Sequence, residues 1–149
     1  MLRFLFQSPW LRRLFAALVG LALGLILVAA WSWWNQRSRQ NLADNLMHAY
    51  VTRDIQAMEN LFCWDGVDEK THSRVRLAIL QEFELMVETV TVKPLLPTDG
   101  HDGPGLRPNL KPDVTIEVTY ATPDHLSAAF LAGRQGLSGH RLIVMLPGN

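Results

Sequence analysis

The chain has 149 residues, enough for one domain beside an N-terminal segment. Its formal net charge is zero, but all 14 acidic residues lie at or beyond Asp44, so the part after Trp34 carries 11 basic and 14 acidic residues. Nucleic acid is bound by basic faces, so this slightly acidic part argues against nucleic acid as a partner.

An uncharged apolar run covers residues 14–34. As a helix this run would be about 31 Å long, close to the roughly 30 Å of a bilayer hydrocarbon core. Three tryptophans end the run, where an interfacial aromatic belt would lie. We therefore expect a single transmembrane helix over residues 14–34, with a short tail before it (1–13) and a polar linker after it (35–41). The lipid bilayer is then the first expected partner.

Basic residues flank the run on both sides, with three before it and two after it: Arg3, Arg12, Arg13, Arg37 and Arg39. Lysine and arginine concentrate on the cytoplasmic side of membrane proteins. The N-terminal side has only one more basic residue than the C-terminal side, but the short N-terminal tail and the long acidic C-terminal domain also favour a cytoplasmic N-terminus. We expect a bacterial inner (plasma) membrane protein with a cytoplasmic N-terminus and a periplasmic C-terminal domain.

The main alternative to a retained signal-anchor is a cleaved signal peptide. Val28-Ala29-Ala30 is an acceptable cleavage site, and cleavage near Ala30 would release a secreted soluble domain. The apolar run is longer than the roughly 7–15 residues of a typical signal-peptide core, which favours the anchor.

Small residues recur every four positions on one face of the apolar run, at Ala16, Gly20 and Gly24. This spacing lets two helix backbones approach closely in a membrane, although glycine and alanine are common in membrane helices in any case. The three residues are a candidate helix-association face for a homo-oligomer.

Two or three amphipathic helices are expected next. Apolar residues repeat at helical spacing over 42–50, and Asp54 is a suitable N-cap for a short helix over 55–62. Asp68 or Thr71 can begin a third helix that runs to about residue 85. Its apolar stripe is expected to contain Val75, Ile79, Leu80, Phe83 and Met86, with Arg74, Arg76, Gln81, Glu82 and Glu84 on the other side.

The pattern then changes to strands, expected at 86–95, 114–120, 126–131 and 140–146. The stretch 97–112 holds four prolines and three glycines and is expected to be a long loop. Helices followed by strands joined by turns predict an α+β domain over residues 42–149, with the helices packed on a curved four-stranded antiparallel sheet.

Residues 49–62 (AYVTRDIQAMENLF) resemble the opening of NTF2-like (cystatin-like α+β) domains, in which a helix ends and an aspartate caps the next one. Residues 61–83 also look like stretches of uncharacterised bacterial membrane proteins. The NTF2-like resemblance covers about residues 41–146 and implies an apolar pocket between sheet and helices. Some such domains are enzymes, such as ketosteroid isomerases and scytalone dehydratases, and many only bind ligands or partners. Some inner-membrane components of bacterial secretion machines have a similar layout.

Four residues are candidates for the lining of such a pocket: Tyr50, Asp54, Trp64 and Tyr120. Asp54 is also explained as a helix cap, and Trp64 as core packing. The lone Cys63 can be buried, paired with another chain or reactive, and burial is the simplest expectation.

No metal or cofactor site is expected. The cluster Asp99, His101 and Asp102 could contact a metal, but polar loops often carry such residues. The acidic group at residues 65–69 is better explained as a turn and a helix cap.

No nucleophile elbow, phosphate-binding glycine loop or zinc motif is present in the sequence, so we expect no catalysis. The favoured hypothesis is a single-pass membrane-anchored protein whose extracytoplasmic domain mediates protein interaction or assembly in the cell envelope, with itself or with another envelope protein. The alternative is a pocket that binds a small molecule or acts as an isomerase or dehydratase. That alternative requires a polar group buried at the base of a cavity of roughly 300 Å³ or more.

Overall fold

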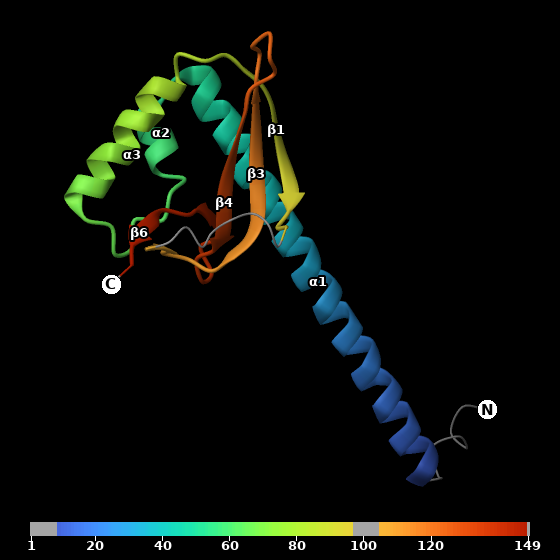
Figure 1. The fold of residues 1–149 in the computed structure, drawn as a ribbon. Helices are drawn as coiled ribbons and strands as arrows, with labels where there is room; N and C mark the ends of the chain where they lie inside the picture. The colour runs from blue at the N-terminus through green and yellow to red at the C-terminus, as the bar shows by residue number, and fades with distance from the viewer. Residues whose placement is uncertain (1–8, 97–104, 149) are drawn as a thin grey trace. The chain divides into compact units, whose positions relative to one another are not determined.

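A computed structural model describes residues 9–96 and 105–148 (Figure 1). Contacts divide the chain into two units, with the boundary between Arg37 and Ser38. Three helices and six strands occur in the described residues: α1 (Pro9–Thr52), α2 (Ile55–Glu59), α3 (Glu69–Glu82), β1 (Val87–Pro94), β2 (Leu106–Pro108), β3 (Pro112–Tyr120), β4 (Ser127–Arg134), β5 (His140–Leu142) and β6 (Met145–Pro147).

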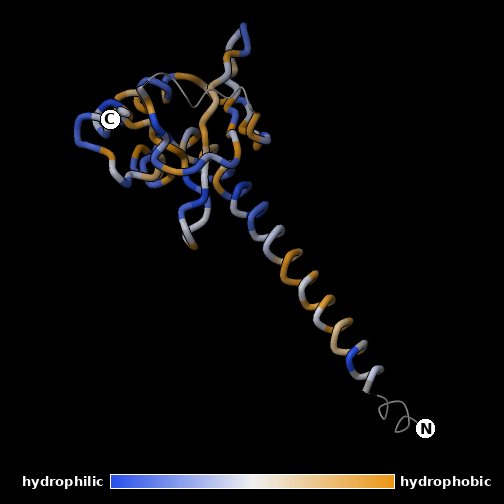
Figure 2. Tube along the Cα trace, turned by 60° about the horizontal axis from the view of Figure 1, so that its bottom comes forward, coloured by the Kyte–Doolittle hydropathy of each residue, from blue (hydrophilic) through white to orange (hydrophobic). Residues whose placement is uncertain are grey.

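The first unit is the N-terminal part of α1. This helix is long and apolar enough to cross a membrane, and none of its most apolar window is buried. Figure 2 shows the apolar residues in orange, with hydrophilic turns before and after them. Residues 35–41, expected as a polar linker, are helical and belong to α1. The guanidinium of Arg37 lies 5.3 Å from the centre of a Trp33 ring, within the range of a cation–π interaction.

The second unit is an α+β domain, as the sequence predicts. Four strands form an antiparallel sheet in the order β1-β3-β4-β5, which is the expected meander. In the central strand β3 the predicted inner residues Val114, Ile116, Val118 and Tyr120 are buried, but Thr115, expected on the other face, is buried as well. The four inner side chains pack with Leu46 of α1 and Met58 of α2 in one hydrophobic core.

Local signals set the helix ends. Arg53 takes a positive φ of 54°, which ends α1. The carboxylate of Asp54 then accepts a hydrogen bond from the Ala57 amide at 3.0 Å and caps α2. Asp68 caps α3 in the same way: its carboxylate oxygen Oδ1 accepts a hydrogen bond from the Thr71 backbone amide at 2.7 Å. The predicted Asp54 cap is confirmed, and of the two alternatives for the third helix, Asp68 and Thr71, the structure has Asp68 as the cap.

The expected loop and the expected last strand both differ from the structure. Of the expected loop 97–112, residues 97–104 lie outside the described residues, and the remainder contains strand β2, which pairs with β6 in a separate two-stranded sheet. The segment 140–146 is two strands, because Val144 leaves the main sheet to bond with Asn109. The side-chain oxygen of Asn109 accepts a hydrogen bond from the Val144 backbone N–H at 3.0 Å. The backbone N–H of Asn109 donates to the Val144 carbonyl at 3.1 Å.

The predicted stripe of α3 is correct for Ile79 and Phe83, which are buried in the core, and for Val75, which packs against it. It is wrong for Leu80 and Met86, which are 48% and 75% exposed. Met86 falls outside the helix, since α3 ends at Glu82.

Candidate functional site

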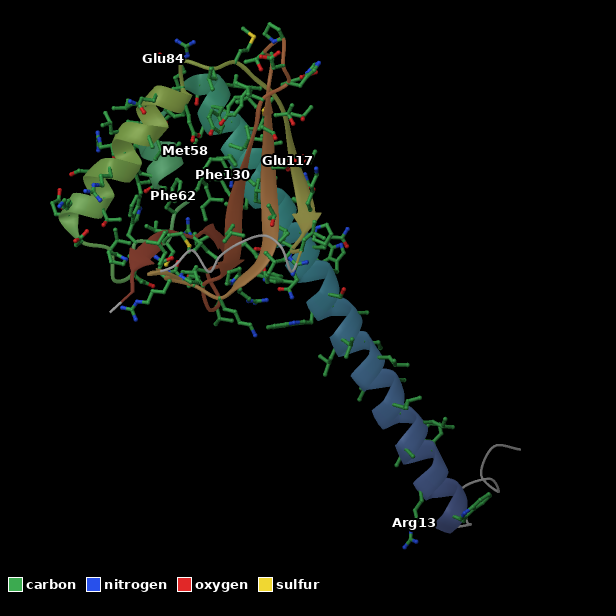
Figure 3. All side chains as sticks on the ribbon, viewed as in Figure 1. Arg13, Met58, Phe62, Glu84, Glu117 and Phe130 are labelled. Atoms are coloured by element: carbon green, nitrogen blue, oxygen red, sulfur yellow. The ribbon has the colours of Figure 1, made fainter. Side chains whose placement is uncertain are left out.

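A pocket of about 290 Å³ lies between α3 and the strands β4 and β6. Figure 3 shows Met58 and Phe62 in the space between α3 and the sheet, with Phe130 extending from β4 toward them. The pocket lining is mostly apolar and consists of Met58, Phe62, Thr71, Val75, Ala78, Ile79, Glu82, Phe130, Ile143, Val144 and Met145.

One carboxylate, that of Glu82, lines this apolar pocket. Two tyrosine hydroxyls hold it. Tyr50 on α1 and Tyr120 on β3 both donate to Glu82 Oε2, the second over 3.3 Å. The two hydroxyls are themselves 3.3 Å apart, and the rings meet edge-on with centroids 6.2 Å apart. Three elements that are far apart in the chain therefore meet at one carboxylate oxygen.

The surroundings of the tyrosine hydroxyls favour their protonated form. Burial raises the pKa of Tyr120, and the neighbouring Glu82 carboxylate raises it further, against a lowering by the hydrogen bond with Tyr50. A phenol that keeps its proton remains a hydrogen-bond donor. Glu82 is therefore held by two donors and has no basic partner among the residues of the pocket lining.

The four sequence-based pocket candidates have different outcomes. Tyr50 and Tyr120 are brought together and orient the carboxylate of the pocket, although neither lines it. Asp54 is exposed and caps α2. Trp64 packs against Phe62, with ring centroids 5.5 Å apart, and donates its indole N–H to a backbone carbonyl at 2.8 Å.

Sequence reasoning missed Glu82, which it placed on the outer side of the third helix. The signal was present in the spacing. Glu82 follows Val75 by seven residues and Ile79 by three, and these offsets share one helix face. The charge of Glu82 outweighed its position in that prediction.

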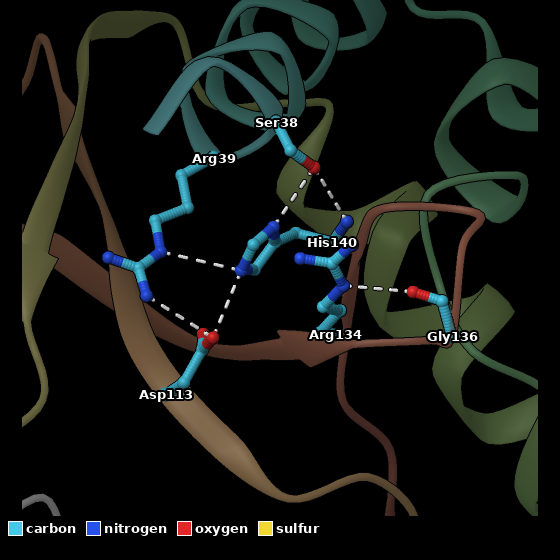
Figure 4. Close-up of polar contacts among 6 residues, drawn as sticks. All are labelled: Ser38, Arg39, Asp113, Arg134, Gly136 and His140. Atoms are coloured by element: carbon cyan, nitrogen blue, oxygen red, sulfur yellow. Dashed lines mark hydrogen bonds and ion pairs between the residues drawn. The ribbon is translucent and has the colours of Figure 1, made fainter. Parts of the chain in front are cut away.

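A second polar cluster surrounds the His140 side chain, which is fully buried (Figure 4). The Ser38 hydroxyl lies 2.9 Å from Nδ1, and Asp113 Oδ2 lies 3.0 Å from Nε2. Arg39 forms an ion pair with the same Asp113 oxygen at 3.3 Å. The cluster thus joins two residues of α1 to β3 and β5.

Serine, histidine and aspartate in hydrogen-bond contact are typical of acyl-transfer enzymes. Here their geometry differs from that of a catalytic triad and instead connects distant parts of the fold. The serine faces Nδ1 and the aspartate Nε2, the reverse of the trypsin-like order. The Ser38 oxygen also accepts the backbone N–H of His140 at 2.9 Å. It is thereby engaged twice by one residue. Nε2 of the imidazole lies between Asp113 Oδ2 at 3.0 Å and the Arg39 Nε–H, which is 3.4 Å away.

The remaining sequence candidates are located as follows. Cys63 is buried, as expected, with 1% of its surface exposed. Beyond its chain neighbours and the adjacent turns of helix backbone, an added Cβ on Gly20 or Gly24 would meet no atom of the described residues within 4 Å, so these two positions of the predicted association face are open. The cluster Asp99, His101 and Asp102 lies outside the described residues.

Comparison of the chain with family models, with curated proteins and with solved structures found no match.

Proposed function

We propose that the chain is a single-pass membrane protein whose α+β domain binds a protein partner, or a second copy, in a bacterial cell envelope. The observation that supports the anchor is the exposure of the apolar part of α1. A helix this apolar in a water-soluble protein would be expected to be covered, whereas none of its most apolar window is buried. We assign residues 14–34 to the membrane, residues 1–13 to the cytoplasm and the domain to the periplasm.

The proposed binding role, which involves no catalysis, agrees with the order of the elements in the domain. The order of elements, helices followed by an antiparallel sheet, agrees with the resemblance of residues 49–62 to NTF2-like domains, and that resemblance stays a prediction. In this proposal the anchor keeps the domain at the membrane, where the small face of Ala16, Gly20 and Gly24 can support self-association.

The interaction and the topology are tested on the full chain in mild detergent. Light scattering after size exclusion and pull-down from crosslinked membranes should give a dimer or a specific complex. A monomer under all conditions contradicts the interaction role. Ser138→Cys, at an exposed turn, should react with a membrane-impermeant maleimide in intact spheroplasts. Labelling only after lysis contradicts the periplasmic placement.

The pocket favours a second candidate function, the binding of a small molecule. Its volume of about 290 Å³ is at the lower limit of known ligand sites, and it combines apolar walls with one oriented polar group. Ala78→Trp would place a large ring in this space. If the pocket binds a ligand, this variant should lose binding and keep its fold. Unchanged binding contradicts this candidate.

A further inference from the structure

The pocket runs along one face of α3. Four of its lining residues, Thr71, Val75, Ala78 and Glu82, are separated by four, three and four positions, which is a single helix stripe. The first and last are eleven residues apart, so the stripe is about 16 Å long at a rise of ~1.5 Å per residue. The pocket, with a volume of about 290 Å³, is therefore elongated along α3, and we call it the slot.

The slot is polar where Glu82 and Thr71 line it and apolar between them. Val75 and Ile79 lie between these two residues on α3, and Phe130 faces them from β4. An elongated apolar slot suits an unbranched chain better than a compact body, because burial of apolar surface favours binding only where the shapes match.

The Glu82 carboxylate selects for a hydrogen-bond donor. Among the described residues, its two hydrogen bonds both reach Oε2, from Tyr50 and Tyr120. Neither of these two hydrogen bonds involves Oε1, the other carboxylate oxygen. None of the described residues that line the slot is a lysine, arginine or histidine, so an anionic head group would meet a carboxylate without a compensating charge from them. An ammonium group has three donors and no acceptor, which suits this carboxylate.

We infer that the pocket binds a primary ammonium compound with an unbranched apolar body, with its head group on Glu82 and its body between α3 and β4. This inference rests on the small-molecule candidate above and is independent of the membrane anchor. The two tyrosine hydroxyls act as positioning groups that fix the carboxylate toward the slot.

The test uses the full chain in nanodiscs with ¹³C-methyl methionine. Two of the five methionines, Met58 and Met145, line the pocket, whereas the 75% exposed Met86 serves as an internal reference. Hexylammonium and hexanoate are titrated separately, since they share a chain and differ in the sign of the head group. We expect the ammonium probe to shift both pocket methyl signals and to bind at least about tenfold more tightly than hexanoate, a difference within reach of one charged contact.

Glu82→Gln keeps the size of the side chain and removes its charge. It should remove the preference for hexylammonium, whereas Glu84→Gln, an exposed change two residues further along, should leave it intact. Hexanoate binding as tightly as hexylammonium, with Glu82→Gln without effect, overturns the ligand class and leaves the pocket as a site. Absence of any pocket methyl shift with both probes overturns the inference and the small-molecule function together.

Discussion

The hydroxyl oxygen of Ser38 lies 2.9 Å from both the backbone nitrogen and Nδ1 of His140, a residue 102 positions further along the chain. Gly139 makes this approach possible. A Cβ at that position would come within 2.8 Å of the Ser38 oxygen, and the backbone there has a φ of 95°. The contact fixes the first residues of the folded unit to the last part of its sheet.

Removal of the Ser38 hydroxyl should therefore destabilise the domain. Ser38→Ala leaves a buried imidazole nitrogen and a backbone N–H without their partner, which typically costs about 1–3 kcal/mol. The free energy of unfolding in urea, measured on the full chain in mild detergent, checks this value. Ser138→Ala, at an exposed turn, is the matched control and should change stability little. Equal stability of the two variants contradicts the structural role of the cluster.

The only two tyrosines of the chain, Tyr50 and Tyr120, should resist ionisation. Burial raises the pKa of Tyr120, so the folded state binds its phenolic proton more tightly than the unfolded state. Stability from this group is complete below about pH 10, the ordinary value for tyrosine, and falls as the pH rises above it. Tyrosinate absorbance at alkaline pH should therefore appear together with unfolding. Its appearance near pH 10 in the folded protein contradicts the network around Glu82.

Cys63 should be unreactive in the folded protein. Burial raises the pKa of its thiol, and the thiolate is the reactive form. Iodoacetamide at pH 8 should modify the native chain slowly and the urea-unfolded chain rapidly, as measured by intact mass. An exposed thiol introduced by Ser138→Cys on a Cys63→Ala background is the positive control. Rapid modification of native Cys63 contradicts its buried position.

The aspartate cap of α3 should respond to acid, and the cap of α2 should respond to substitution. Thr71 lowers the pKa of Asp68 through its side-chain and backbone hydrogen bonds, so the contribution of this carboxylate to stability is present at neutral pH and is lost as the pH falls through the lowered pKa.

Asp54→Ala removes the cap of α2 and should cost about 0.5–2 kcal/mol, whereas Asp54→Asn should retain most of the stability that the cap provides. Unfolding curves of the two variants at pH 7 check this order, and equal loss in both contradicts the cap.

Sequence reasoning succeeded where one local rule acts alone. The alternation around Ile116 and Val118 predicts a half-buried strand, because the side-chain period of a strand is two residues. Asp54 and Asp68 predict helix starts, since a short side-chain acceptor satisfies free amides of the first turn. These features need no knowledge of distant parts of the chain.

It failed where a distant partner decides the structure. The end of β5 depends on Asn109, which is 35 residues from Val144, and no local pattern marks that pairing. The cluster at His140 depends on Ser38 in the same way. Glu82 differs from both. Its helix position predicts an inward side chain, but a carboxylate faces inward only when donors such as Tyr50 and Tyr120 meet it there.

Carbonate extraction determines whether the apolar part of α1 holds the chain in a membrane. The full chain should remain in the membrane pellet after an alkaline carbonate wash. A variant with Leu21→Arg and Leu25→Arg, two positions that are exposed in the helix, should be released. Recovery of the unaltered chain in the aqueous supernatant would contradict the anchor and with it the proposed location of the domain.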